Sequence, residues 1–327
     1  MFEYLSKIGK PEVYHGAKKK SDFFEGWFYK IVSPDEKNIL AVIPGIFLSA
    51  DKSKEHSFIQ ILDGKNHESF YLKYDKNDFR FTADRFEIEI GNSFFSDEKL
   101  ILDLDSDNLN LKGSLFFNNQ KEWPKTLLSP GIMGWYSYVP FMECNHGIIS
   151  LNHSVNGELT INGAKITFDG GKGYGEKDWG SSFPSSYVWM QTNHFDDPTV
   201  SFTGSVAKIP WLFSSFRGFI IGLLIGEKLY KFATYTGAVL DHLKVNENYT
   251  EFKVHDKKHI LIANAERTKG GLLHGPYENE MTQRVSESLD SKIKVKLVDR
   301  KSGKIIFEGE GKHAGLDING KLEEIVD

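Results

Sequence analysis

The chain has 327 residues, of which 40% are hydrophobic, 26% are charged and 13% are aromatic, led by 25 phenylalanines. This composition is typical of a folded protein, and its aromatic content favours strands and apolar cavities over helical bundles. The formal net charge is −5, and the compact basic cluster Lys18-Lys19-Lys20 fits a solvated turn, so nucleic acid is not an expected partner.

Short alternating patterns and tight turns recur along the chain. They predict half-buried antiparallel strands joined by hairpins, because alternation places apolar side chains on one face. Dipeptides such as Asp-Gly and Asn-Gly supply the turns. In chain order, Asp63-Gly64 separates residues 57–62 from 69–72, and apolar residues alternate at Phe86, Ile88 and Ile90 and again at Leu100, Leu102 and Leu104. Asn156-Gly157 and Asn162-Gly163 then lie within a meander over 147–168, and lysines alternate with apolar residues over 292–297.

The apolar segment over residues 209–226 is the best candidate for a membrane span, but Arg217 interrupts it. We interpret it as a buried strand over 216–225, a turn at 226–228 and a strand over 229–236. Peripheral membrane contact stays open around residues 210–213 (PWLF). Helical patterns are scarce, and only residues 281–292 are predicted to hold a short helix.

These patterns predict an all-β protein, since many short strands favour sandwiches or barrels. The length accommodates two barrels, one over residues 1–170 and one over 171–327, with a glycine-rich boundary at 169–173. A site beside this boundary would lie at a domain junction, where ligands often bind.

The loop-like sequence GYGEKDWG over residues 173–180 sets two acids beside two aromatic residues. Glutamates also occur in aromatic surroundings over 23–29 and 135–146. Burial in an apolar pocket raises a carboxyl pKa and can keep the acid protonated near neutral pH. Such an acid facing aromatic walls is suited to protonating an alkene.

Four acids are therefore candidates for general acid or base. A salt bridge or a bond to backbone N–H groups explains each of them singly, with Lys177 and Lys30 as plausible partners. Asp178 could also fix its loop through an Asx turn, so Glu176 and Glu143 rank above it. The candidates are Glu25, Glu143, Glu176 and Asp178.

Metal and nucleotide sites are not expected. Glu143, His146 and His153 do not converge if they occupy a strand, and Cys144 is the single cysteine. The glycines over 171–175 lack the spacing of a phosphate loop. His153 is predicted to hydrogen-bond in a core or line a cavity, and His194 could orient a polar ligand group.

Most aromatic side chains fill cores, but several lie near acids or polar residues. Aromatic faces stabilise a carbocation by about 0.5–2 kcal/mol each and bind an isoprenoid equally well without catalysis. The predicted ligand-binding residues are Trp27, Trp135, Tyr136, Tyr138, His153, Trp179, Trp189, Gln191, Asn193 and His194.

The sequence resembles the tocopherol cyclase family, which is similar to carotenoid 1,2-hydratases. The resemblance lies in residues 24–30, 134–143, 173–183, 188–195 and 314–320. It implies two lipocalin-like β-barrels with ligands held at or between them and no redox cofactor or metal. It also implies closure of a chromanol ring, in which the alkene of a prenylated hydroquinone is protonated and a phenol oxygen attacks.

We therefore expect a cytosolic or peripherally membrane-associated protein that cyclises a prenylated or polyene ligand. Glu176 or Glu143 would donate the proton, and Asp178 or His194 would position the phenol. A start close to the first motif and a richness in Lys, Asn and Ile suggest a bacterial source. The alternatives are a hydratase or isomerase that uses the same protonation, and a non-catalytic carrier of lipids or isoprenoids.

Overall fold

The computed structural model describes residues 7–277 and 279–326, in which nearly all regular structure is antiparallel strand. The contacts divide the chain into two units. The first runs to Phe183 and includes Leu272–Arg284, and the second comprises Pro184–Gly271 and continues from Val285. The described helices are 3₁₀ segments: η1 (Gly16–Lys18), η2 (Lys52–Lys54), η3 (Lys76–Asp78), η4 (Gly134–Tyr138), η5 (Thr234–Thr236) and η6 (Leu322–Glu324).

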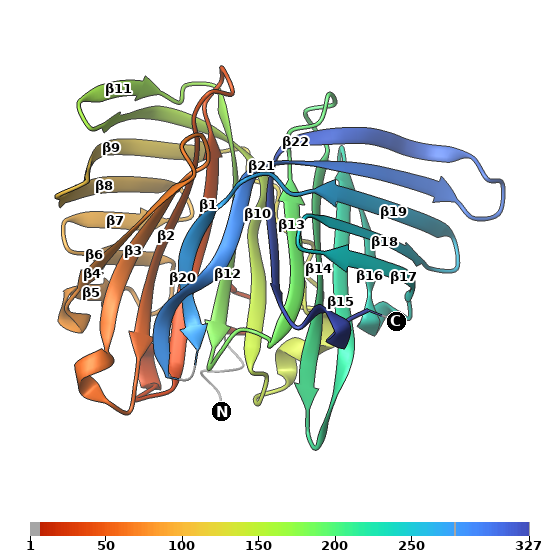
Figure 1. Cartoon of the computed structure of the whole chain (residues 1–327), viewed down its shortest axis with the longest axis horizontal. Coiled ribbons are helices and arrows are strands. Elements are labelled where there is room, and N and C mark those ends of the chain that lie inside the picture. The colour runs from red at the N-terminus through yellow and green to blue at the C-terminus, as the bar shows by residue number, and fades with distance from the viewer. Residues whose placement is uncertain (1–6, 278, 327) are drawn as a thin grey trace. The chain divides into compact units, whose positions relative to one another are not determined.

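A 12-stranded sheet forms the first unit, in the order β4-β3-β2-β1-β12-β10-β9-β8-β7-β6-β5, with β11 paired to β10 (Figure 1). Its strands are β1 (Phe23–Val32), β2 (Ile39–Leu48), β3 (His56–Asp63), β4 (Glu68–Tyr74), β5 (Phe79–Phe81), β6 (Glu87–Ile90), β7 (Ser93–Ser96), β8 (Lys99–Ser106), β9 (Leu109–Asn118), β10 (Cys144–Ile161), β11 (Ala164–Thr167) and β12 (Gly171–Gly180).

The first sheet curves around a single hydrophobic core. Trp27 of β1, Val42 of β2, Ile59 of β3, Ile88 of β6 and Leu102 of β8 belong to one cluster of buried side chains. β3 and β6 lie near opposite ends of the strand order, so their side chains meet only because the sheet bends. The alternation seen in the sequence supplies this inward face, as expected for half-buried strands.

A 10-stranded sheet contains the strands of the second unit, in the order β16-β15-β14-β13-β22-β21-β19-β18-β17, with β20 paired to β21. Its strands are β13 (Ser186–Thr192), β14 (Ser201–Trp211), β15 (Ser214–Ile225), β16 (Lys228–Ala233), β17 (Val239–Asn246), β18 (Tyr249–His255), β19 (His259–Glu266), β20 (Gly271–Tyr277), β21 (Glu280–Asp299) and β22 (Ile305–Gly320). The part of this sheet within Leu272–Arg284, namely most of β20 and the start of β21, is assigned to the first unit by its contacts.

The second sheet also bends around its own core. Met190 of β13, Ile221 of β15, Phe252 of β18 and Val295 of β21 pack into one cluster. Apolar residues of β21 point into this core, whereas Lys292, Lys294 and Lys296 alternate with them on the exposed side. The all-β prediction with two antiparallel sheets is therefore confirmed.

Two local predictions are wrong. Residues 281–292 are strand rather than helix, because this stretch belongs to β21, which pairs with β22 from Glu287 onward and with β19 from Lys292 onward. Asn156-Gly157 is not a turn but lies inside the 18-residue strand β10. Gly157 has φ +117° there, and a Cβ atom would meet the Ser114 carbonyl oxygen of the neighbouring strand at 2.2 Å. By contrast, Asn162-Gly163 forms the expected turn between β10 and β11.

The strands predicted over 216–225 and 229–236 correspond to β15 and to β16 with η5. Within the described residues, no helix has both the length and the hydropathy required to cross a bilayer.

The unit boundary differs from the one expected at residues 170/171. β12 begins at Gly171, but it pairs with β1 and β10 in the first sheet, so the division falls after Phe183. The later segment Leu272–Arg284 also belongs to the first unit. The side chain of Gln60 in β3 makes two hydrogen bonds with the backbone of His274. Gln60 Nε2 donates to the His274 carbonyl oxygen at 3.0 Å, and the His274 backbone N–H donates to Gln60 Oε1 at 2.8 Å.

Candidate active site

Three neighbouring strands of the first unit, β1, β12 and β10, bring the acidic motif together with a histidine. Asp178 of β12 lies opposite Gly26 of β1 on one side and His146 of β10 on the other. Because successive side chains of a strand alternate between faces, Glu176 and Asp178 share one face and Lys177 points to the other. The sheet therefore carries two separate charged clusters, one on each face.

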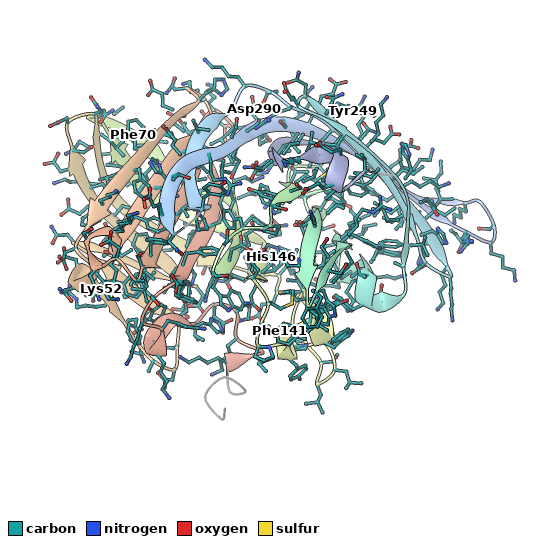
Figure 2. All side chains as sticks on the ribbon, turned by 60° about the horizontal axis from the view of Figure 1, so that its bottom comes forward. Lys52, Phe70, Phe141, His146, Tyr249 and Asp290 are labelled. Atoms are coloured by element: carbon teal, nitrogen blue, oxygen red, sulfur yellow. The ribbon has the colours of Figure 1, made fainter. Side chains whose placement is uncertain are left out.

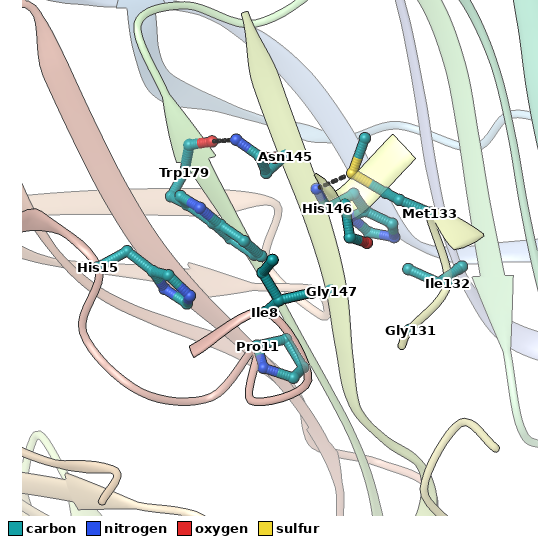
Figure 3. Close-up of a pocket in the computed structure, with 11 residues that line it drawn as sticks. Ile8, Pro11, His15, Gly131, Ile132, Met133, Asn145, His146, Gly147 and Trp179 are labelled. Atoms are coloured by element: carbon teal, nitrogen blue, oxygen red, sulfur yellow. Dashed lines mark hydrogen bonds between the residues drawn. The ribbon is translucent and has the colours of Figure 1, made fainter. Parts of the chain in front are cut away.

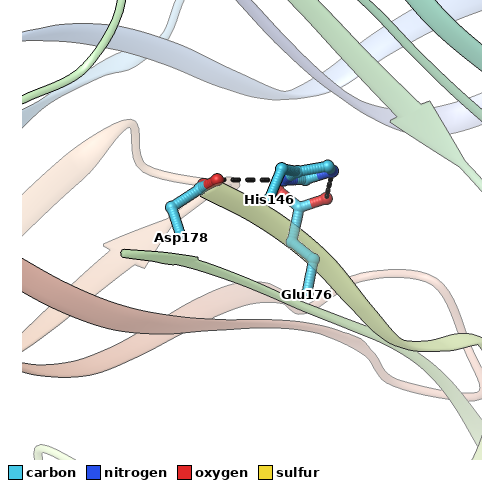
Figure 4. A group of neighbouring side chains, drawn as sticks. All are labelled: His146, Glu176 and Asp178. Carbon is cyan, nitrogen blue, oxygen red and sulfur yellow. Dashed lines mark hydrogen bonds and ion pairs between the residues drawn. The ribbon is translucent and has the colours of Figure 1, made fainter. Parts of the chain in front are cut away.

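His146 is the centre of the first cluster (Figure 4). Its Nδ1 lies 2.9 Å from Asp178 Oδ1, and its Nε2 lies 3.7 Å from Glu176 Oε2. The hydroxyl of Tyr174 donates a hydrogen bond to the same oxygen of Glu176. Tyr174 and Glu176 are buried, whereas His146 and Asp178 are partly exposed. A tyrosine, a glutamate, a histidine and an aspartate thus form one continuous polar chain.

The charge state of His146 follows from its two acidic neighbours. Burial alone would lower the pKa of the imidazole, but the carboxylates of Asp178 and Glu176 outweigh this effect and raise the pKa to about 9. His146 is therefore an imidazolium at neutral pH, with one N–H directed to Asp178 and the other toward Glu176. An imidazolium between two carboxylates can donate a proton to either of them, and the neutral imidazole that remains can take a proton back.

The opposite face holds a buried ion pair between Glu25 of β1 and Lys177 of β12, both fully buried. Glu25 also accepts hydrogen bonds from the backbone N–H groups of His15, at 2.9 and 3.0 Å, and of Gly16, at 3.0 Å. Burial raises the pKa of Glu25, but the charge of Lys177 and the bond with His15 outweigh it, so the pKa is lowered. Glu25 is consequently held as a carboxylate with its oxygens occupied.

Lys177 is tied to its surroundings from several directions. Its Nζ donates to the carbonyl oxygen of Val13 and lies 2.9 Å from His15 Nδ1. It also sits 4.7 Å from the ring centres of both Trp27 and Trp179, where the aromatic faces attract a cation. Burial lowers the pKa of Lys177 to about 8 despite the attraction of Glu25. This cluster fastens residues 13–16 onto the sheet.

A pocket lies beside His146 of the first cluster and beside His15 and Trp179 of the second (Figure 3). It contains about 420 Å³ of empty space that includes open solvent, and only a small part of it is wide enough for water. The ring of Trp179 forms one wall, stacked on His15 with centroids 4.4 Å apart. The lining residues are Ile8, Pro11, His15, Gly131, Ile132, Met133, Ser137, Asn145, His146, Gly147 and Trp179.

His146, Glu176 and Asp178 each offer a potential metal ligand, with the three ligand atoms within 4.8 Å of one another. These atoms are already engaged in the contacts within the cluster and with Tyr174. Acid–base chemistry therefore accounts for the arrangement directly. The expectation that no metal is required stays a prediction.

The other sequence-predicted residues of the first unit lie apart from the His146 cluster. Glu143 is half-buried just before β10, and burial raises its pKa. Trp27 is a core residue stacked on Phe86, with its Nε1 donating to Glu12 O at 2.7 Å. Trp135, Tyr136 and Tyr138 occupy η4, where Trp135 and Tyr136 stack on each other.

His153 is fully enclosed in the first unit. Neither ring nitrogen has a hydrogen-bond partner among the described residues, and its ring centre lies 4.6 Å from that of Phe117. Burial lowers its pKa to about 3, so the imidazole is neutral. A Cβ atom at Gly173 would meet His153 Nε2 at 2.1 Å, which explains a glycine at this position of the motif. The histidine is buried, but the predicted hydrogen bond is not seen within the described residues.

The remaining predicted residues belong to β13 and the residues after it, in the second unit. Trp189, Gln191, Asn193 and His194 are all buried. His194 Nδ1 lies 2.9 Å from Asn193 Oδ1. Among the described residues, no hydrogen-bond partner is found for the side-chain amide of Gln191, neither for Nε2 nor for Oε1. Their ligand-binding role stays a prediction.

Two important residues lie outside the predicted site. The sequence offers His146 only as a metal ligand that is not expected, although it lies opposite Asp178 in the sheet. Tyr174 lies within the recognised motif without a predicted role, whereas Lys177 forms the expected kind of ion pair with an acid, Glu25. The alternation of Glu176, Lys177 and Asp178 was the available signal, since it predicts opposite faces once the segment is taken as a strand.

Comparison with known proteins agrees with the motif resemblance. Residues 118–320 match the family model described as tocopherol cyclase-like. The chain belongs to the tocopherol cyclase-like family. This membership rests on more than half of the chain and includes β10, β12 and the whole His146 cluster.

Two curated relatives of this family member are plant proteins. The probable chloroplastic tocopherol cyclase of Oryza sativa subsp. japonica is 22% identical over 197 residues, which cover 57% of this chain and 42% of the relative. The chloroplastic tocopherol cyclase of Zea mays is 23% identical over 197 residues, covering 57% of this chain and 41% of the relative. The aligned part thus spans less than half the length of these relatives.

Solved structures extend the likeness of fold to nearly the whole chain. Kievitone hydratase from Nectria haematococca has a TM-score of 0.50 at 10% identity, covering 95% of each chain. CghA with Sch210972 has a TM-score of 0.56 at 9% identity, covering 91% of this chain and 89% of that one. Together with the two curved sheets, these likenesses support the lipocalin-like fold class.

Proposed function

We propose that this protein catalyses acid-promoted cyclisation of a prenylated hydroquinone or a related isoprenoid. The observation that carries the proposal is the placement of His146 between Glu176 and Asp178, with Tyr174 bonded to Glu176. Membership of the tocopherol cyclase-like family supports the choice of substrate class. The reaction would be an isomerisation, because every atom of the substrate is retained.

In the proposed mechanism, the imidazolium of His146 passes its Nε2 proton to the Glu176 carboxylate, and Glu176 delivers that proton to the alkene carbon. Protonation breaks the carbon–carbon π bond and leaves a tertiary carbocation. A phenol oxygen then attacks the cation to form the C–O bond, and its proton returns to the cluster. Asp178 positions His146 through Nδ1, and Tyr174 holds the Glu176 carboxyl.

The pocket beside His146 supports the proposal but is narrow. Trp179 and Met133 offer apolar and aromatic contacts to a ligand. A typical pocket for a small organic ligand has about 300–1,000 Å³, and little of the space here admits even water. Binding of a ring would therefore require the walls formed by residues 8–15 or 131–137 to move apart.

The test is incubation of the purified protein with prenylated hydroquinones, followed by chromatography for chromanols. We expect turnover by the wild type and a loss of about 10²–10⁴-fold in Glu176→Gln, the range typical of general acid catalysis. Glutamine retains the size of the side chain but cannot donate the proton. Glu143→Gln is the matched control, since Glu143 lies outside the His146 cluster, and it should turn over within about threefold of wild type.

The products distinguish the alternatives. A hydrated product would indicate the same protonation with water as the nucleophile, so the protein would be a hydratase. Recovery of a bound but unchanged isoprenoid would indicate a carrier. Normal turnover by Glu176→Gln combined with loss in Glu143→Gln would transfer the donor role to Glu143.

A further inference from the structure

The segment over residues 126–141, here called the apolar loop, contains no charged residue and no histidine. It begins with a tight turn in which Thr126 and Ser129 exchange backbone hydrogen bonds of 2.9 and 3.1 Å. This turn displays Leu127 and Leu128 at its tip, with 85% and 81% of their surfaces exposed. Isolated exposed leucines are common, but two at one tip within an uncharged segment are not.

Exposed aromatic residues follow this tip in the same loop. Trp135 and Phe141 are 45% and 57% exposed, and Tyr138 reaches back to donate a hydrogen bond to the carbonyl oxygen of Leu127. Phe141, labelled in Figure 2, follows the end of η4 at Tyr138 by three residues. Tryptophan and tyrosine concentrate where a protein crosses the headgroup level of a bilayer, because their rings are apolar with one polar atom.

The other side of the same loop faces the pocket. Ile132 and Met133 are buried, and together with Gly131 and Ser137 they line the pocket next to His146. The apolar loop is therefore a thin wall with apolar side chains on both of its sides. The centre of a protein interface is also poor in charge and rich in aromatic residues, but a polar rim surrounds it. A wall that lacks charge along its whole length is suited to the hydrocarbon side of a membrane interface.

We propose that the apolar loop docks onto a lipid bilayer and admits an apolar substrate from the bilayer to the pocket. The choice of lipid rests partly on the proposed function, since a prenylated ring partitions into membranes. Leu127 and Leu128 enter the acyl region, and Trp135 and Tyr138 lie at the headgroup level. This places membrane contact in the first unit rather than at residues 210–213.

The experiment measures binding of the full chain to neutral phosphatidylcholine vesicles by sedimentation. We expect wild type to bind and Leu127→Asp/Leu128→Asp to bind at least tenfold more weakly. The matched control is Leu212→Asp/Phe213→Asp, which places the same two charges at an exposed apolar turn of the second unit, where these residues are 71% and 105% exposed. The control should bind within threefold of wild type.

Several outcomes would overturn the proposal. They are absence of wild-type binding, full binding by the Leu127/Leu128 variant, and equal loss in both variants. Light scattering without vesicles tests a second copy as the occupant: a wild-type dimer that Leu127→Asp/Leu128→Asp dissociates would replace the lipid. Leu127→Ser/Leu128→Ser provides a milder change if the aspartates impair folding.

Turnover separates this proposal from the proposed function. With a short-chain substrate dispersed in detergent, the Leu127/Leu128 variant should retain activity within twofold of wild type. With the same substrate embedded in vesicles, it should lose at least tenfold. Vesicle binding that depends on the loop without turnover on either substrate would sink the proposed function and leave the docking surface in place.

Discussion

At the scale of single residues, the four candidate acids occupy distinct environments that their sequence contexts did not reveal. Glu176 and Asp178 flank a cationic histidine, whereas Glu25 neutralises a buried lysine. Glu143 remains half-buried outside both clusters. The difference arises from what each strand neighbour places opposite the acid, so aromatic surroundings in the sequence were only a partial guide.

His146 makes stability depend on pH in a defined window. Its pKa is about 9 in the folded protein against an ordinary value of 6.5, because the carboxylates outweigh the effect of burial. The stabilising contribution is therefore complete below pH 6.5 and lost as the pH rises through about 9. A shift of this size corresponds to roughly 3 kcal/mol.

In the wild type, the stabilising contribution of protonated His146 is lost as the pH rises toward 9. We expect the free energy of unfolding of His146→Gln, measured by urea denaturation, to lack this loss. Lys177 titrates near pH 8 in the same window, so the informative quantity is the difference between wild type and variant. That difference should shrink between pH 6 and pH 9.5. A difference that stays constant across the window would show that His146 is not held as a cation.

At the scale of elements, β12 separates two tasks by its alternation. One face presents Glu176 and Asp178 to His146, and the other presents Lys177 to Glu25. β1 and β10 fix the register on both sides, so neither face can shift without the other. A strand that is one residue out of register would exchange the two clusters.

The buried ion pair on the inner face should control stability. Lys177→Met leaves the carboxylate of Glu25 buried without its cation, which we expect to lower the free energy of unfolding by about 3–5 kcal/mol. Glu25→Gln/Lys177→Met should recover part of this loss, because the unpaired charge is removed as well. Urea denaturation of both variants checks the coupling, and equal destabilisation by the single and double changes would argue against it.

At the scale of the whole molecule, the chain contributes most residues of the second unit, Pro184–Gly271, before the segment Leu272–Arg284 returns to the first unit. Leu272–Arg284 contacts the first sheet through Gln60. The side-chain amide of Gln60 forms hydrogen bonds with both the backbone N–H and the carbonyl oxygen of His274. The rings of Tyr71 and His274 stack beside it with centroids 4.0 Å apart. These residues are about two hundred positions apart, so local sequence patterns contain no trace of the contact.

Gln60→Ala should loosen this returning segment. It leaves two backbone groups without their partner, which typically costs about 1–3 kcal/mol when the groups are buried. Hydrogen exchange measured by mass spectrometry should rise in residues 272–277 and stay unchanged in β12. Gln283→Ala is the control, since this exposed side chain makes one bond to Leu272 O at 3.2 Å, and exchange as fast in the control as in Gln60→Ala would contradict the assignment.

The sequence by itself determined the all-β class, most strands, the turn at Asn162-Gly163 and the family. These features depend on local alternation, on turn chemistry and on motifs that are contiguous in the chain. It also located Glu176 and Asp178. Only the tertiary structure decided that residues 281–292 form strand, because pairing with β19 and β22 overrides local preference. It alone brought His146 to the two acids, since cross-strand neighbours are set by sheet register rather than by distance along the chain.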